Sequence, residues 1–236
     1  MRIYNKYSLL MCMAIFTSVT FANCSDDNNK EKVVTEQTKD MTTLFKAIEQ
    51  NNIEIVKQEL AKNSNLETKN SKGQTPLMLA TYLVNNDIAF LLIDHGANVN
   101  TQDNNLNSPF LYAGAEGNLA LVKKCLENGA DFKVFNRYNG SALIPAAEKG
   151  HLQVVKLLVN TPDFPIDHVN RLGWTALMEA IVLSDGGKVH THIVHELIKG
   201  GVNVNIKDHD GKTPLYHAKK RGFTEIVKLL EEAGAK

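Results

Sequence analysis

Apolar residues recur at spacings of three and four along most of the chain, which is the period of an amphipathic helix. The apolar segment 77–80 is followed by a second one at 88–92 and then by Gly96. Thr75 and Pro76 precede the first segment, and they suit an N-cap and the first helical position. A glycine after the second segment suits a helix end, where positive φ is needed. The pattern predicts a helix–turn–helix unit and an all-α fold.

The same unit returns at a nearly constant period. Its opening Thr or Ser lies at positions 75, 108, 141, 175 and 213, in steps of 33, 33, 34 and 38 residues. A weaker copy, Thr42-Thr43-Leu44, lies 33 residues before Thr75. One unit alone cannot bury its apolar face, whereas stacked units share a continuous core. We therefore expect a solenoid of about six repeats, with approximate bounds 42–70, 71–103, 104–136, 137–170, 171–208 and 209–236.

Residues 41–236 resemble the ankyrin repeat family, in which a period of about 33 residues accompanies a Thr-Pro-Leu turn. The matching phrases lie at 75–77 and 213–215, with looser copies at 108–110, 141–143 and 175–177. Ends such as Gly96-Ala97-Asn98-Val99-Asn100 speak against a tetratricopeptide array, the main alternative. The resemblance implies a curved stack whose concave face consists of turn tips and first helices. It also implies non-covalent binding of another protein.

The first 22 residues have the composition of a secretory signal peptide. Arg2 and Lys6 form a positive start, residues 9–19 form a short apolar core, and small residues precede a cleavage point after Ala22. The apolar run is short for a membrane-spanning helix, and an uncleaved N-terminal anchor is the alternative. Residues 23–40 are polar and charged without apolar periodicity, so we expect a disordered linker there.

Cys24 lies just after the apolar core, and its surroundings resemble the start of a bacterial lipoprotein, whose first cysteine is acylated. The preceding residues 21–23 depart from the usual motif, which begins with Leu and ends with Gly or Ala. Two alternatives stay open: cleavage after Ala22, which releases the protein into the periplasm, or a lipid on Cys24 that tethers it to the cell envelope. Both predict an exported protein. Secretion as an effector that binds a host protein is a further alternative.

Charge and cysteine content narrow the class of partner. Lys and Arg number 26 together, as do Asp and Glu, so charge favours neither nucleic acid nor an anionic membrane surface. We expect a monomer that meets a membrane only through a lipid on Cys24. Cys125 aligns with core positions such as Leu92 and Leu158, which indicates a buried thiol. The fold is therefore not expected to depend on disulfides.

The chain lacks the nucleophile, nucleotide-binding and zinc-protease motifs of common enzymes, so we expect neither catalysis nor a cofactor. The segment 184–195 supplies the alternative of a metal-binding protein or an enzyme. Five extra residues around Gly186 are expected to end the first helix of this repeat early and to enlarge the loop. His192 and His195 lie three apart, and His190 or Asp185 would complete a metal site. Solvated histidines are the simpler interpretation.

Apolar residues at positions that face solvent in the family's layout suggest a partner site. They lie beside the turn glycines and late in the first helices of the fourth and fifth repeats, at Tyr138, Leu172, Trp174, Val182 and Leu183. An exposed apolar patch rimmed by polar groups marks an interaction site, and Trp and Tyr are frequent interface anchors. The alternative is that Trp174 packs under the enlarged loop. The sequence leaves these two interpretations open.

Overall fold

The computed structural model describes residues 42–236, which belong to one compact unit. The predicted signal peptide at 1–22, the linker at 23–40 and Cys24 lie outside the described residues. The described part of the chain is built of helices and turns and contains no β-strand. The expected all-α solenoid is therefore confirmed for this part of the chain.

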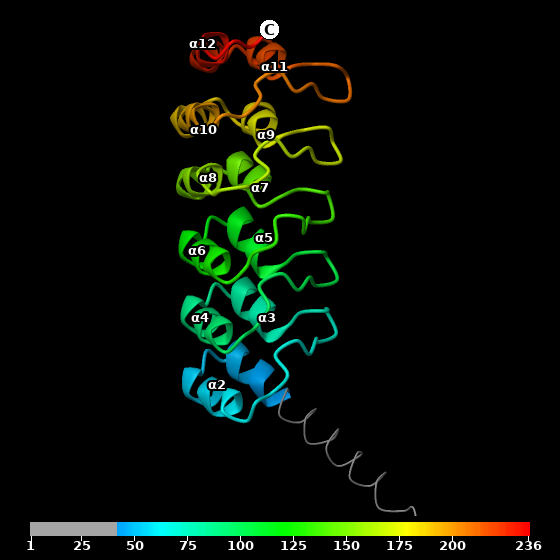
Figure 1. The fold of residues 1–236 in the computed structure, drawn as a ribbon, viewed down its shortest axis with the longest axis vertical. Coiled ribbons are helices and arrows are strands. Elements are labelled where there is room, and N and C mark those ends of the chain that lie inside the picture. The colour runs from blue at the N-terminus through cyan, green and yellow to red at the C-terminus, as the bar shows by residue number, and fades with distance from the viewer. Residues whose placement is uncertain (1–41) are drawn as a thin grey trace, which may run out of the picture. The chain divides into compact units, whose positions relative to one another are not determined.

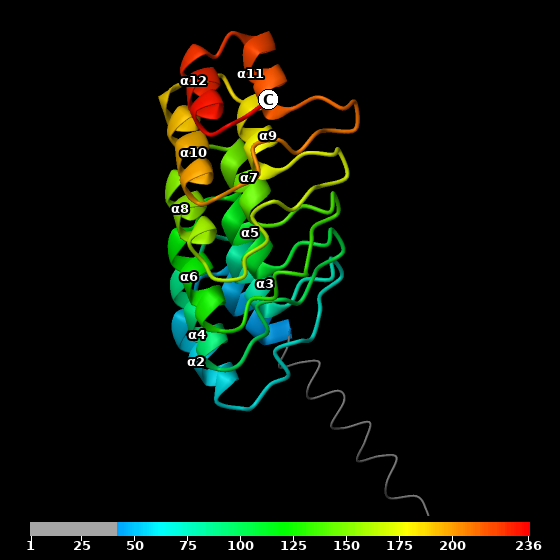
Figure 2. The same cartoon turned by 45° about the horizontal axis from the view of Figure 1, so that its top comes forward.

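The helices alternate between an inner and an outer column, and the turns project from the side of the inner column (Figures 1 and 2). The inner column comprises the helical segment 42–49, α3 (Pro76–Tyr82), α5 (Pro109–Ala115), α7 (Leu143–Glu148), α9 (Ala176–Val182) and α11 (Pro214–Arg221). The outer column comprises α2 (Ile53–Leu60), α4 (Asn86–Asp94), α6 (Leu119–Glu127), α8 (Leu152–Val159), α10 (Lys188–Lys199) and α12 (Thr224–Glu232).

Most of the inner helices begin at the predicted N-cap residues. The Thr75 hydroxyl accepts a hydrogen bond from the Met78 N–H at 3.2 Å, and Ser108, Thr175 and Thr213 cap their helices in the same way. Ser141 is the exception, because α7 begins after Ala142 and has no side-chain cap. The outer helices α2, α4 and α6 are capped instead by Asn52, Asn85 and Asn118. Polar residues at fixed positions thus define where each helix begins.

One continuous core runs through the stack, because each inner helix from α3 onward contacts the inner helix of the next repeat. It extends from Leu44 to Leu230 and includes the fully buried Cys125, as expected for an apolar thiol. The inner helices of two repeats approach closely at Gly114, where an added Cβ would lie 2.7 Å from the Cβ of Ala142. Small residues at such contacts let neighbouring backbones pack tightly.

The expected early end of the first helix in the fifth repeat is wrong. Helix α9 has seven residues, as α3 does, and the extra residues lengthen the 183–187 connection and α10, which has twelve residues against nine in α4. The connection packs on the last repeat, since the Arg221 guanidinium donates to the carbonyls of Val182 at 3.0 Å and Ser184 at 2.5 Å. A Cβ on Gly186 would overlap the ring of Phe223.

Candidate interaction surface

Each turn between an outer helix and the next inner helix is fixed by one Asn or Asp side chain. In the fifth repeat, Asn170 Oδ1 accepts hydrogen bonds from the N–H groups of Leu172 at 2.9 Å and Trp174 at 3.0 Å. Gly173 lies between these two and has φ +81°, which glycine adopts without steric cost. The same arrangement recurs at Asn70, Asp103, Asn136 and Asp208. The turn tips are therefore rigid before any partner arrives.

Tyr138 and Leu172 occupy neighbouring turn tips. Their side chains are 52% and 53% exposed, and the Arg171 N–H donates to the Tyr138 carbonyl at 2.9 Å, which joins the two turns. The guanidinium carbon of Arg137 lies 4.9 Å from the centre of the Tyr138 ring. Two large apolar side chains on fixed backbone, next to exposed arginines, form a surface that a partner can bury without first ordering it.

The other predicted patch residues lie along α9. Leu183, at the C-cap of this helix, is half exposed, whereas Trp174 and Val182 are half-buried. Trp174 precedes the N-cap Thr175 and Leu183 follows the last helical residue, so the seven residues of α9, about 10 Å of rise, lie between Trp174 and Leu183. The predicted residues thus form two groups, one at the turn tips and one at the far end of α9.

Glu179 lies on α9 between these groups and was not anticipated. The carboxylate is buried: Oε1 accepts a hydrogen bond from Asn170 Nδ2 at 2.8 Å, and Oε2 has no hydrogen-bond partner. Burial and, to a smaller extent, the Glu148 charge raise the pKa of Glu179, the Asn170 hydrogen bond lowers it, and the net result is a pKa of about 7. Near neutral pH this side chain therefore changes charge. Aligning the repeats would have revealed it, because the equivalent residue is elsewhere Lys46, Leu79, Tyr112, Pro145 or His217, and an acidic side chain occurs at this position in the fifth repeat alone.

The equivalent turns in other repeats contain polar clusters whose groups satisfy one another. Tyr82 Oη donates to Asp103 at 2.7 Å and accepts from Asn107 at 2.9 Å, while its ring packs edge-on against Tyr112 at 4.4 Å. Burial raises the pKa of Tyr82 to about 12, so the phenol keeps its proton. These contacts hold the turn against the inner helix.

The histidines of the 184–195 segment do not converge. His190 is half-buried, with Nε2 at 2.9 Å from the Glu148 carbonyl and Nδ1 at 3.5 Å from Asp185, whereas His192 and His195 are exposed on α10. Between residues 42 and 236, no group of three or more His, Cys, Asp or Glu side chains is placed to hold a metal ion. The geometry therefore gives the metal-site alternative no support.

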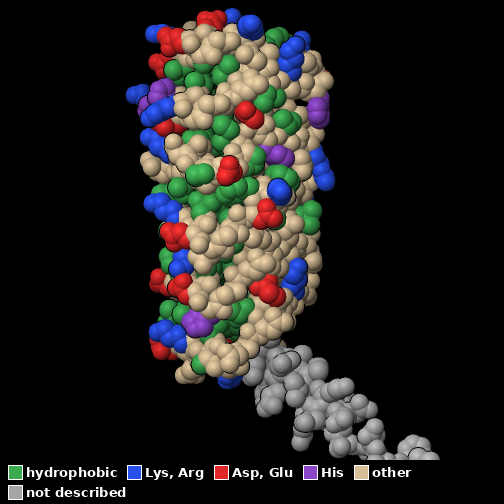
Figure 3. Space-filling model, viewed as in Figure 1, with side chains coloured by type: hydrophobic (Ala, Val, Ile, Leu, Met, Phe, Trp, Pro, Cys, Tyr) green, Lys and Arg blue, Asp and Glu red, His purple; other side chains and the backbone are tan. Residues whose placement is uncertain are grey.

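Figure 3 shows the charged side chains concentrated along the edge formed by the outer helices, while hydrophobic side chains surface mainly in the middle of this face. Among residues 42–236, no helix is long and apolar enough to span a bilayer. Burial raises the pKa of the Cys125 thiol to about 12, so that this cysteine is not a reactive nucleophile.

Paired helices stacked at a period of about 33 residues, with turns projecting from the inner column, define a helical repeat protein. The family model for ankyrin repeats in three copies matches residues 10–103, 110–189 and 184–236. The chain belongs to the ankyrin repeat family. A putative ankyrin repeat protein of Escherichia coli K12, YahD, is 46% identical to this chain over 80 residues. These residues cover 34% of this chain and 39% of YahD. The match thus spans less than half of the length of YahD.

Solved structures share the fold over most of the chain. An ankyrin repeat domain from Acinetobacter baumannii AYE is 47% identical, with a TM-score of 0.80 over 82% of this chain and 98% of that one. The ankyrin repeat protein EF0377 is 39% identical, with a TM-score of 0.79 over 81% and 98%. The ankyrin repeat domain of Bcl-3, a member of the IkappaB family, is 25% identical, with a TM-score of 0.73 over 82% and 86%.

Proposed function

We propose that this chain is a non-catalytic binding module that captures another protein through its turn tips and inner helices, with Tyr138, Leu172, Trp174, Val182 and Leu183 as contact residues. Ankyrin repeats are generally protein–protein interaction modules, and proteins built from them are typically scaffolds rather than enzymes. The architecture is suited to this role, since a rigid stack offers an extended surface with little ordering cost.

The observation that carries the proposal is the pair Tyr138 and Leu172, both about half exposed on turns fixed by Asn136 and Asn170. Folding alone gives no reason to place large apolar side chains at these tips. Burying the exposed half of such a side chain is worth about 1 kcal/mol. Together with Trp174 and Leu183, such contacts would supply several kcal/mol toward binding, enough to anchor an interface.

Capture from an envelope extract, followed by mass identification, would name the partner. We expect Tyr138→Ser combined with Leu172→Ser, and separately Trp174→Ala, to reduce its recovery severalfold with little change in the melting curve. Val189→Ser is a matched control, because Val189 is 49% exposed but lies on the outer helix α10. Equal recovery with all variants would refute the proposed surface. A large loss of stability in Trp174→Ala would assign that side chain to packing instead.

We also propose export to the periplasm or attachment to the cell envelope, which rests on the signal-like residues 1–22 and on Cys24. Fractionation tests this, because an effector would appear in the medium or the host. If a lipid is attached, Cys24→Ala would move the protein from the membrane fraction to the soluble envelope fraction. An unchanged distribution in that variant would exclude the lipid.

A further inference from the structure

The turn between an inner and an outer helix requires a left-handed residue, and in the second repeat this residue is Val84. Its φ is +55°, while Asn51, Gly117, Gly150 and Gly222 take positive φ at the corresponding turns. Asparagine and glycine adopt this conformation readily, whereas a β-branched residue there is strained. Valine is therefore a costly choice for this position.

Burial does not compensate for the strain. The Val84 side chain is 65% exposed, and the adjacent Leu83 is 48% exposed. A side chain held in an unfavourable conformation and presented to solvent contributes little to the stability of the fold. Strain of this kind that persists at the surface is a recognised feature of functional positions.

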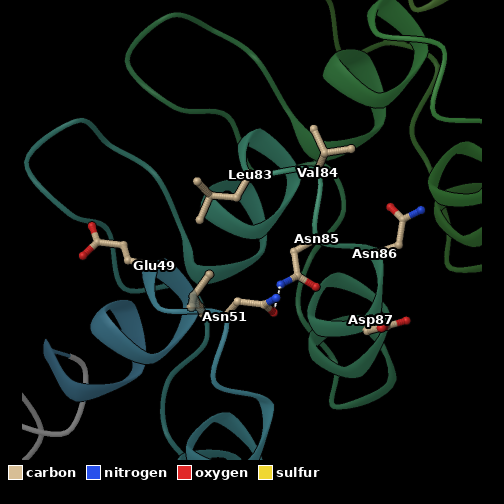
Figure 4. Close-up of a pocket in the computed structure, with 8 residues that line it drawn as sticks. Glu49, Asn51, Leu83, Val84, Asn85, Asn86 and Asp87 are labelled. Atoms are coloured by element: carbon tan, nitrogen blue, oxygen red, sulfur yellow. Dashed lines mark hydrogen bonds between the residues drawn. The ribbon is translucent and has the colours of Figure 1, made fainter.

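Leu83 and Val84 line a groove of about 490 Å³ between the first two repeats. Its lining also includes the buried Ile48 and the asparagines Asn51 and Asn85, which hydrogen-bond to each other (Figure 4). Glu49 and Asp87 lie on opposite sides of this asparagine pair. The groove thus combines an apolar edge with an acidic rim.

Within the part of the chain that the structure describes, no Lys or Arg pairs with the carboxylate of Glu49 or of Asp87. Glu49 and Asp87 are exposed, neither has a salt bridge to a described Lys or Arg, and no basic residue lines the groove. An acidic rim around an apolar edge selects against an acidic partner and for a basic one.

We propose that this groove is a second docking site, separate from the turn tips, and that it takes a partner segment in which an apolar side chain is flanked by Lys or Arg. The apolar side chain covers Leu83 and Val84, and the basic groups pair with Glu49 and Asp87. The strained valine is retained for this contact at the expense of stability.

The probes are three short synthetic peptides, one of alternating Lys and Leu, one of alternating Glu and Leu, and one of alternating Lys and Ser. Each is titrated into the methyl-labelled repeat protein, and NMR follows the methyl signals of Leu83 and Val84. We expect saturable shifts with the Lys–Leu peptide only, and weaker shifts at higher salt. No saturation up to millimolar Lys–Leu peptide, or equal shifts with either other peptide, would overturn the proposal.

Val84→Asn separates strain from contact, because Asn51 occupies the equivalent position without strain. We expect this variant to raise the midpoint of thermal unfolding and to weaken Lys–Leu binding about fivefold, as loss of an apolar contact would. Glu49→Gln with Asp87→Asn should weaken binding and flatten its salt dependence. Val189→Ala is the control, since Val189 is 49% exposed on α10. A lower midpoint in Val84→Asn, or undiminished binding in either groove variant, would refute the inference.

Discussion

Glu179 makes the stability of this protein depend on pH, and Glu179→Gln isolates its share. Glutamine has nearly the same shape and can still accept the hydrogen bond from Asn170, but it never ionises. Burial and the nearby Glu148 raise the pKa of Glu179 from its ordinary 4.5 to about 7. A carboxyl with a raised pKa in the folded state supports the fold while protonated. Its contribution is fully present below about pH 4.5 and is lost as the pH rises through about 7.

The size of the effect follows from the pKa difference. Each unit corresponds to about 1.4 kcal/mol, so a carboxylate shifted from 4.5 to about 7 penalises the fold by at most about 3 kcal/mol when fully ionised. Water outside the inner helices screens part of this penalty, and we expect roughly half of it at pH 8. Glu179→Gln should then be about 1.5 kcal/mol more stable than the parent protein at pH 8, and nearly equal to it at pH 5.

The free energy of unfolding of the parent and of the variant is measured with urea at pH 5 and pH 8. The difference between the two proteins at each pH removes the contribution of the histidines, which both contain. Equal slopes with urea are required, because repeat arrays can lose two-state behaviour. For a domain of this size, the pH 8 gain corresponds to about 3–6 °C in thermal midpoint. If the parent and the variant lose stability in parallel between pH 5 and pH 8, Glu179 does not titrate there. Glu148→Gln, which removes the neighbouring charge, should move the transition to lower pH.

Two further substitutions test the contacts between repeats. Gly114→Ala should lower the free energy of unfolding by about 1–2 kcal/mol in urea, because the clash with Ala142 outweighs the better helix propensity of alanine. A gain in stability would contradict this, since it would mean that the two helices move apart without losing packing. Arg221→Ala removes two hydrogen bonds to the carbonyls of Val182 and Ser184, so we expect a loss of about 1 kcal/mol and faster amide exchange at 184–187. Unchanged amide exchange at 184–187 would mean that the connection keeps its conformation without Arg221.

The repeat architecture is predictable because it is specified locally and many times over. Thr75 and Thr213 cap their helices as their position before Pro indicates, and the same pattern in each repeat identifies the next. The buried Cys125 follows from its alignment with Leu92 and Leu158, since equivalent positions in a stack share one core. Features of this kind need no knowledge of distant contacts.

The insertion in the fifth repeat could not be predicted in this way. The sequence shows Gly186-Gly187 and five extra residues, which favour a helix break and a projecting loop. What holds the connection is Arg221 and Phe223 of the following repeat, more than thirty positions away. Likewise, the apolar tips at Tyr138 and Leu172 were predictable from their offset to the turn. The separation of Val182 and Leu183 from them depends on the length and direction of α9.

Val84 and Glu179 show why departures from the repeat are more informative than agreement with it. In a stack, each repeat contacts only its neighbours, so the stability of the whole is close to a sum of local terms. A residue that costs stability in one repeat is tolerated as long as the adjacent interfaces remain intact, and selection for folding alone would replace it with the residue used elsewhere. In the four other repeats without the insertion, the positions equivalent to Val84 hold Asn or Gly, and the positions equivalent to Glu179 hold Lys, Leu, Tyr, Pro or His. Val84 faces solvent beside the groove, whereas Glu179 is buried and hydrogen-bonds to Asn170 of the fifth turn. A strained valine beside an open acidic groove is therefore better explained by the binding we propose than by folding, whereas the buried Glu179 carboxyl is a cost to folding that grows as the pH rises.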